Sequence, residues 1–279
     1  MVSTHTERLR EISGRHNAVL KELRRAFAHG ELTEDGECAI EGLRIVEEAI
    51  RSGLRFRAVF FSESGKRLTE RLMPQLRANV ETLVLPDKLF ASAVPSETPQ
   101  GVAALVRVKQ FKLQDVLGGG QTDGRPALVV GVVGIQDPGN LGTLLRSAEA
   151  FDATGVVLGG KTVSAYNSKV VRASAGSLFR IPMVRTKSTE VVSQLRVRGI
   201  RLLATSSHQG TPLYEARLAE PLAIFIGSEA AGVPREVLSM VDEVIAIPHS
   251  SKVESLNAGV AASIVLYEAA RQRQSLERA

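Results

Sequence analysis

The sequence has little of several residue types, and each shortage excludes a class of site. Cys38 is the single cysteine among 279 residues, so an internal disulfide framework and a thiolate metal cluster are both excluded. The five histidines are scattered, and no two stand at the i, i+4 spacing of a helical metal site. We therefore expect no protein-bound metal and a reducing, cytoplasmic environment.

Aromatic residues are also scarce: they make up 4% of the chain, and tryptophan is absent. A base-stacking platform of the kind used by many single-strand binders is therefore not expected. The formal net charge is +5, with an isoelectric point of about 9.5. This charge fits an RNA partner bound through its phosphates and shape, but an ordinary basic protein would carry it equally well.

Long apolar runs are missing as well. None approaches the roughly 20 residues of a membrane span, and the polar N-terminal stretch, MVSTHTERLREISGRH, does not resemble a secretory signal. Hydrophobic residues nevertheless make up 44% of the chain. This content allows a substantial buried core, and the length suggests two domains.

The N-terminal half predicts a basic arm and a small domain. Residues 1–30 carry six Arg or Lys against three Glu, with a helix expected at 17–27. The arm either contacts RNA, with Arg15 and Arg24 as candidate contacts, or is a solvated amphipathic helix. Residues 31–108 alternate helices (37–50, 67–76, 86–93) and strands (57–61, 82–85, 101–108). We interpret them as an α/β RNA-binding module, since they contain no acid–base pair or phosphate loop.

The C-terminal half predicts a larger α/β domain. Residues 109–126 are rich in glycine and polar residues, which is typical of a flexible linker. Beyond it, residues 127–279 alternate six expected strands (128–135, 155–158, 181–184, 200–205, 222–226, 243–247) with five helices (141–151, 167–177, 188–198, 234–241, 256–272). This alternation predicts a mostly parallel sheet with helices on both faces.

The first loop of interest precedes the 141–151 helix and begins with Asp137. Leu141, Leu144, Leu145 and Ala148 form the stripe of a buried helix face. Gly142, Arg146 and Glu149 fall on the opposite side, so Arg146 is expected to project from the sheet edge where α/β proteins bind ligands. The stretch contains neither G-x-G-x-x-G nor a P-loop, which argues against a nucleotide-dependent oxidoreductase.

Two further loops follow strands. In the loop from Ile226 to Pro234, Gly227 ends a strand without a side chain, which would let a ligand approach the backbone. In the stretch from Val244 to Ala262, Ser255 is well placed as the N-cap of the last helix. The small residues of that helix allow either close packing or a ligand against its backbone.

Together these loops resemble motifs one, two and three of the SpoU/TrmH family of RNA ribose 2′-O-methyltransferases, in the SPOUT superfamily. The matching text is NLGTLLRSAEAF from Asn140, IGSEAAGV from Ile226 and IPHSSKVESLNAGVAA from Ile247. The segments SKVVRASAGSLF from Ser168 and TPQGVAAL from Thr98 are similar to other parts of the family. The resemblance covers essentially the whole chain, and the combination of three motifs is far more specific than any one of them.

The resemblance implies a fold and a cofactor. It implies a catalytic domain tied in a deep trefoil knot, preceded by a substrate-binding domain with a fold shared by some ribosomal proteins. S-adenosylmethionine would be held by backbone around Thr205, Gly227, Ile247 and Leu256. Members form homodimers through the knotted domain, and the final helix is the candidate contact.

The resemblance also implies the site. It assigns Arg146 to the reacting ribose, with Asn140, Glu229, Ser255 and Asn257 around it. Arginine keeps its proton at neutral pH, so we interpret Arg146 as a clamp that stabilises the developing alkoxide, with a phosphate oxygen or water as the open choice of proton acceptor. Asn140 could also be a helix N-cap, and Glu229 a salt-bridge partner. Among the basic residues, Arg172 joins the candidate RNA contacts.

Two departures from the family pattern stand on the cofactor side: His249 where methionine is frequent, and Ala258-Gly259 in place of a more usual Val-Ser. Neither changes the polar groups. The expected function is therefore methylation of a ribose 2′-hydroxyl, in large ribosomal RNA or alternatively in transfer RNA. A non-catalytic RNA-binding protein with the same fold is the competing class.

Overall fold

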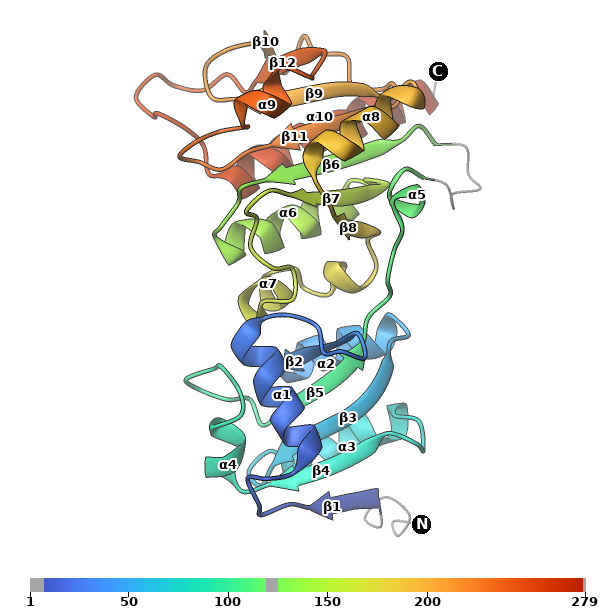
Figure 1. The fold of residues 1–279 in the computed structure, drawn as a ribbon, viewed down its shortest axis with the longest axis vertical. Helices are drawn as coiled ribbons and strands as arrows, with labels where there is room; N and C mark the ends of the chain where they lie inside the picture. The colour runs from blue at the N-terminus through green and yellow to red at the C-terminus, as the bar shows by residue number, and fades with distance from the viewer. Residues whose placement is uncertain (1–7, 119–124, 278–279) are drawn as a thin grey trace. The chain divides into compact units, whose positions relative to one another are not determined.

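The computed structural model describes residues 8–118 and 125–277 (Figure 1). Residues 1–7 of the predicted arm, residues 119–124 of the predicted linker and residues 278–279 lie outside the described residues. The described residues form two compact units. Unit 1 extends to Lys109 and also includes Ser164–Phe179; unit 2 consists of Gln110–Val163 and the described residues from Arg180 onward.

Unit 1 contains a five-stranded sheet with the order β1-β4-β3-β5-β2, in which β5 is antiparallel to its neighbours β3 and β2. Its strands are β1 (Leu9–Glu11), β2 (Glu37–Glu41), β3 (Arg55–Ser62), β4 (Glu81–Leu85) and β5 (Val102–Arg107). Its helices are α1 (Ala18–His29), α2 (Leu43–Arg51), α3 (Thr69–Leu72), α4 (Asp87–Ala91) and α7 (Ser168–Ala173), with short 3₁₀ turns η2 (Lys66–Leu68), η3 (Met73–Gln75) and η4 (Ser177–Phe179).

One prediction for unit 1 was wrong. The helix expected at 37–50 is instead a strand and a shorter helix, because Gly42 with φ 97° separates β2 from α2 and all five β2 residues are buried beside β5. The helix expected at 17–27 is present as α1, which buries Leu20, Leu23 and Ala26 in the core, and β1 of the same basic segment pairs with β4. Burial of an apolar helix face outweighs the high charge of this segment.

Unit 2 contains a seven-stranded sheet in which every pairing is parallel, with the order β10-β12-β9-β11-β6-β7-β8. Its strands are β6 (Leu128–Val133), β7 (Gly155–Gly159), β8 (Met183–Arg185), β9 (Arg201–Ser206), β10 (Thr211–Pro212), β11 (Leu222–Ile226) and β12 (Glu243–Ala246). Its helices are α5 (Leu113–Val116), α6 (Pro138–Ala150), α8 (Ser188–Val197), α9 (Arg235–Leu238) and α10 (Ala258–Glu277). The six predicted strands, the parallel sheet and four of the five predicted helices are confirmed in this unit. The helix predicted at 167–177 is the shorter α7 of unit 1, and β10 and α5 were not predicted.

Both faces of this sheet are covered. Val129, Val133 and Phe225 pack with residues of α5, α8 and α9 in one apolar cluster. Strand residues that point to the other face, such as Val130, are equally buried, as are Leu144 and Leu145 of α6 and Val265 and Leu266 of α10. Successive strand residues alternate between faces, so α6 and α10 cover the second face, where they pack against each other.

Part of the predicted linker is ordered. Val116 and Leu117 are buried in the unit 2 core, and the backbone of Val116 lies so near Gly155 that a Cβ there would come within 2.7 Å of its Cα. Residues 113–117 are thus a docked helix. Among the described residues, no helix is long and apolar enough to cross a membrane.

A buried carboxyl in unit 1 gives a pH-dependent prediction. Burial raises the pKa of Glu41 above its ordinary value of 4.5, although the Ser96 hydroxyl, which donates at 2.7 Å, and the nearby Arg172 partly offset this. A folded-state pKa raised in this way means that stability is lost as the pH rises through the folded value. We expect Glu41→Gln to be more stable than the wild type at neutral pH, with an advantage that shrinks toward pH 4.

Urea unfolding followed by circular dichroism at the two pH values measures this difference. Glu34→Gln is the matched control, because the Glu34 side chain is 93% exposed; it should change stability little at either pH. An equal advantage for Glu41→Gln at both pH values would contradict the assignment.

Candidate active site at the carboxyl edge of the parallel sheet

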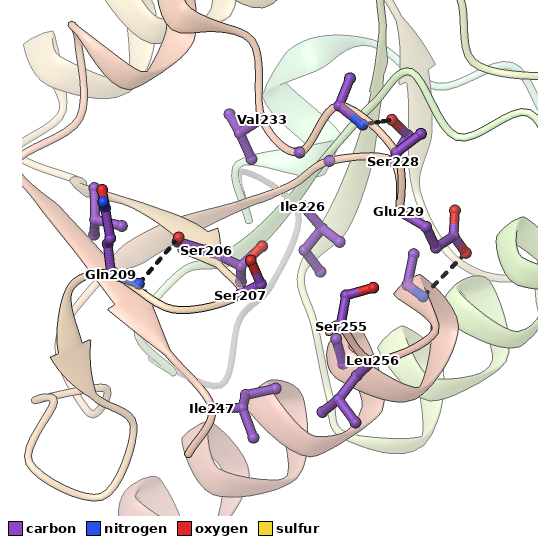
Figure 2. Close-up of a pocket in the computed structure, with 18 of the residues that line it drawn as sticks. Ser206, Ser207, Gln209, Ile226, Ser228, Glu229, Val233, Ile247, Ser255 and Leu256 are labelled. Atoms are coloured by element: carbon purple, nitrogen blue, oxygen red, sulfur yellow. Dashed lines mark hydrogen bonds between the residues drawn. The ribbon is translucent and has the colours of Figure 1, made fainter. Parts of the chain in front are cut away.

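The loops that follow β9, β11 and β12 surround one cavity of about 420 Å³. Because parallel strands end at the same edge of a sheet, these loops meet there although they are far apart in sequence. The first turns of α10 complete the wall with Ala258 and Ala261. Ile226, Ile247 and Leu256 face the same space from three segments, as Figure 2 shows. A cavity of this size with apolar walls and polar loop backbone suits a small organic ligand.

The four residues expected around the cofactor, Thr205, Gly227, Ile247 and Leu256, all line this cavity. The Thr205 hydroxyl donates to the backbone oxygen of Phe225 at 3.3 Å, which joins β9 to β11 at the cavity wall. The structure therefore brings these four residues together as predicted, and their role toward a cofactor remains a prediction.

The β11 loop itself requires glycine at position 227. A Cβ at this position would lie 2.0 Å from the carbonyl carbon of Gly232 and 2.3 Å from the nitrogen of Val233. The following loop folds back onto Gly227, since the Gly232 N–H donates to the backbone oxygen of Ser228 at 2.9 Å. The space that a side chain would need is filled by the protein's own backbone, so the loop requires glycine here. Gly227 also lines the cavity, and the approach of a ligand to its backbone stays a prediction.

Beside the cavity, three polar side chains form a connected group from three segments. The Asn140 amide donates to Oε1 of Glu229, and the Asn257 amide donates to Oδ1 of Asn140 at 2.7 Å. Oε1 of Glu229 also accepts from the backbone N–H of Ala258 at 3.1 Å. We name Asn140, Glu229 and Asn257 the polar triad. It fixes the start of α6, the β11 loop and the start of α10 to one another.

The helix caps differ from those predicted. Asp137 caps α6, accepting from the Asn140 N–H at 2.8 Å, so Asn140 is not the N-cap and its side chain is available to Glu229. Asn257 accepts from the Val260 N–H at 3.1 Å, in the pattern of an N-cap for α10, whereas Ser255 stands two residues before Asn257. Ser255 is exposed and lines the cavity instead.

Arg146 lies on α6, as its spacing predicted, and its side chain is exposed. It does not line the cavity, and within the described residues no hydrogen bond or ion pair holds its guanidinium group. The two residues expected to share its outward side of the helix are placed differently: Gly142 is buried, and Glu149 pairs with Arg180. Arg146 is thus an exposed cation on the helix that carries Asn140, and its guanidinium group is accessible to an anion.

The three candidate RNA contacts lie in unit 1 and differ in their surroundings. Arg15 is exposed. Arg24 is partly buried and donates to the Ser92 hydroxyl at 2.8 Å. Arg172 donates to the Ser96 hydroxyl at 3.3 Å and lies 3.9 Å from the Glu41 carboxylate. Two of the three therefore already have protein partners, and the predicted contact with RNA is untested.

Sequence reasoning missed part of the cavity. Ser206, Ser207 and Gln209 line it from the end of β9 and the loop that follows, whereas His249, which also lines it, was expected on the cofactor side. The missed residues of the β9 loop follow a strand as a polar run, TSSHQG, which is the same signal that drew attention to the other loops. Within the described ranges no group of three or more potential metal ligands occurs.

A parallel α/β sheet with a small-ligand cavity and the polar triad at its carboxyl edge is the arrangement of α/β proteins that bind a ligand at the ends of their strands, as many enzymes do. Residues 127–267 match the SpoU rRNA Methylase family, and residues 17–104 match the MRM3-like substrate binding domain. The chain belongs to the SpoU rRNA methylase family, which confirms the resemblance seen in the three motifs.

Similar proteins agree with this placement. The chain is 31% identical over 259 residues to the 23S rRNA (guanosine(2553)-2′-O)-methyltransferase RlmP of Bacillus subtilis, covering 93% of this chain and 98% of the relative. The SpoU methyltransferase AviRb of Streptomyces viridochromogenes, in complex with the cofactor AdoMet, superposes with a TM-score of 0.80 at 28% identity, covering 93% and 99% of the two chains. An AdoMet-bound rRNA methyltransferase of Sinorhizobium meliloti gives 0.79 at 25% identity, covering 95% and 98%.

The polar triad gives a prediction about stability. Glu229→Ala removes the acceptor shared by the Asn140 amide and the Ala258 N–H, and we expect a loss of roughly 1 kcal/mol in the free energy of unfolding. Glu229→Gln keeps an acceptor oxygen and should lose less.

Thermal unfolding of the two variants, compared with the wild type, measures this order. Glu236→Ala in α9, an exposed glutamate, serves as the control and should melt like the wild type. If Glu229→Ala also melted like the wild type, the triad would not hold the three segments together.

Proposed function

We propose that this chain transfers a methyl group from S-adenosylmethionine to a ribose 2′-hydroxyl of ribosomal RNA. The observation that carries the proposal is the juxtaposition at one sheet edge of a small-ligand cavity and the polar triad, with the free cation Arg146 on the triad's helix. Membership of the SpoU rRNA methylase family and the names of the relatives support it.

The residues of the cavity fit this cofactor. Its volume of about 420 Å³ lies in the range typical of nucleoside-sized ligands. Ile226, Ile247 and Leu256 offer apolar walls to an adenine ring, and the backbone of the β9 and β11 loops offers polar groups for its edge. In the proposed function the bound cofactor supplies an electrophilic methyl group on a positively charged sulfur.

The protein's own part in the reaction falls to Arg146, which lies outside the cavity, and to the polar side chains at and beside the cavity wall. A 2′-hydroxyl is a weak nucleophile, and negative charge develops on its oxygen as it loses its proton. Arg146 is permanently charged, so it acts by stabilising that oxygen and orienting the RNA phosphate rather than by accepting the proton. Asn140 and Glu229 fix the start of α6, and Ser255 and Asn257 complete the polar rim. A phosphate oxygen or water takes the proton.

We propose further that unit 2 is knotted and pairs with a second copy. After β12 the chain passes the cavity and forms α10, which packs on α6. The strand that leads into α6, β6, is three positions from β12 in the sheet, and this route supports a trefoil knot. On α10, Val260, Ile264 and Tyr267 are 47%, 36% and 56% exposed and share one helix face, which suits a homodimer contact.

In the same proposal unit 1 binds the RNA. Its match to a substrate binding domain supports this role, and the name of the Bacillus relative favours large ribosomal RNA over transfer RNA. The basic segment 1–30 and the domain 31–108 would then position the RNA, while residues 127–279 carry out the transfer. Such an enzyme works in the cytoplasm, where ribosomal RNA is found.

Arg146→Ala tests the chemistry. We expect methyl transfer to fall by roughly 10²- to 10³-fold, because the guanidinium stabilises charge that is present only in the transition state. Cofactor binding should change little, because Arg146 does not line the cavity. Transfer of radiolabelled methyl to RNA and calorimetry with the cofactor measure the two quantities. Arg198→Ala, at an exposed site on unit 2, is the control; undiminished transfer by Arg146→Ala would refute the clamp.

The substrate is tested in cells that lack this protein. We expect one alkali-resistant 2′-O-methyl position of large ribosomal RNA to become sensitive to alkaline cleavage, and to be restored by the wild-type chain but not by Arg146→Ala. Loss of a position in transfer RNA instead would assign the alternative substrate. No change in any RNA would favour the non-catalytic RNA-binding protein.

A further inference from the structure

Two histidines stack at the rim of the cavity. His208 follows β9 and His249 follows β12, and their ring centroids lie 5.4 Å apart at an interplanar angle of 29°. Ser207 and Gln209, the neighbours of His208, line the cavity, and so does His249, whereas His208 itself does not. The side chain of His208 is exposed. The stack therefore begins at the cavity wall and ends at the outer surface.

The inner ring of the stack is held in place by the sheet. Nδ1 of His249 lies 2.7 Å from the backbone oxygen of Ile247, which can only accept, so Nδ1 is the donor of this hydrogen bond. The second ring nitrogen of His249, Nε2, is buried. Ile247 directly follows β12, which ends at Ala246. His208 therefore rests on a ring whose position is set by the end of a sheet strand.

The surroundings of His208 decide what can cover its ring. Ser207 and Gln209 on either side of it are exposed and polar. An apolar protein surface placed on this ring would leave these polar groups without partners, which is unfavourable. A nucleobase, by contrast, offers a flat face to an aromatic ring and hydrogen-bonding groups along its edge. The ring and its polar neighbours together suit a base.

The position of His208 distinguishes the RNA from the cofactor. In the proposed function the cofactor occupies the cavity, and His208 is not one of the residues that line it. The RNA has to approach from outside, because its 2′-hydroxyl must reach the methyl group of a cofactor inside the cavity. Bases near the reacting ribose are then at the cavity mouth. Unstacked bases of single-stranded RNA are commonly bound on aromatic side chains, histidine included.

We propose that His208, supported by His249, is a stacking site for one base of the RNA at the mouth of the cavity. This assignment rests on the proposed function, which puts the cofactor in the cavity and the RNA outside it. Aromatic residues make up only 4% of the chain, so a platform of several rings is not expected, but one ring face is enough for one base. The site contributes to the binding of RNA and not to that of the cofactor.

Two variants separate the ring of His208 from its hydrogen-bonding groups. His208→Gln keeps polar groups and removes the ring, so the KM for RNA should rise about tenfold, a typical effect of losing one base–aromatic stack. His208→Phe keeps a ring and should keep a KM near that of the wild type. Radiolabelled methyl transfer to ribosomal RNA from cells lacking this protein measures KM. Calorimetry with S-adenosylmethionine should show unchanged affinity in both variants. A wild-type KM in His208→Gln would overturn the stacking site.

The absence of tryptophan from the chain allows the stack to be observed directly. His208→Trp places a single indole at the proposed site, and the same ribosomal RNA should quench its fluorescence in a saturable way. The matched control is Val197→Trp on α8, at a position that is 89% exposed, and its emission should not change.

The outcomes separate the stacking site from the proposed function. Unchanged emission of His208→Trp, in the presence of RNA that this variant methylates, would overturn the stacking site alone. RNA that quenched His208→Trp but was not methylated by the wild type would overturn the proposed methyl transfer and support the stacking site. A wild-type chain that bound no RNA would overturn both.

Discussion

The carboxylate of Glu229 holds the site together. One of its oxygens accepts from the side chain of Asn140 and from the N–H that begins α10, and Asn257 closes the group by donating to Asn140. A single acidic residue on a strand–helix loop thereby fixes two helices that begin far apart in the sequence. The cavity depends on this constraint, because its walls are the β11 loop and the first turns of α10.

Close backbone contacts make this arrangement possible. A Cβ at Gly259 would lie 3.1 Å from the Thr143 Cβ and 3.3 Å from the backbone oxygen of Asn140, so the small residue lets α10 lie directly on α6. The Ser147 and Ser263 hydroxyls meet at 2.7 Å further along the same contact. The small residues at the start of α10 thus serve helix packing, which brings Asn257 to Asn140. Gly227 has a similar role in the β11 loop.

This packing divides the sheet edge into two kinds of surface. The cavity is bounded by loop backbone, apolar side chains and polar side chains such as Ser207 and Gln209, which suits a small cofactor. The triad has its hydrogen-bonding groups engaged with each other, so it positions rather than reacts. Arg146 lies outside both and is exposed on α6. In the proposed function this separation leaves one cation for the RNA, while the cofactor is held by groups that carry little charge.

The sequence by itself determined the parts that depend on local periodicity. The strands around α6, the buried stripe from Leu141 to Ala148 and the outward direction of Arg146 all follow from spacing within a few residues. Around Gly42 the spacing of the apolar residues predicted a single helix, whereas the structure has a strand before this glycine and a helix after it. Tertiary structure alone decided the partner of Asn140, which is 89 residues away in one contact and 117 in the other. The contacts of Asn140 arise only when distant strands end at the same edge. The need for glycine at position 227 became visible only in the folded β11 loop, which turns back onto that residue.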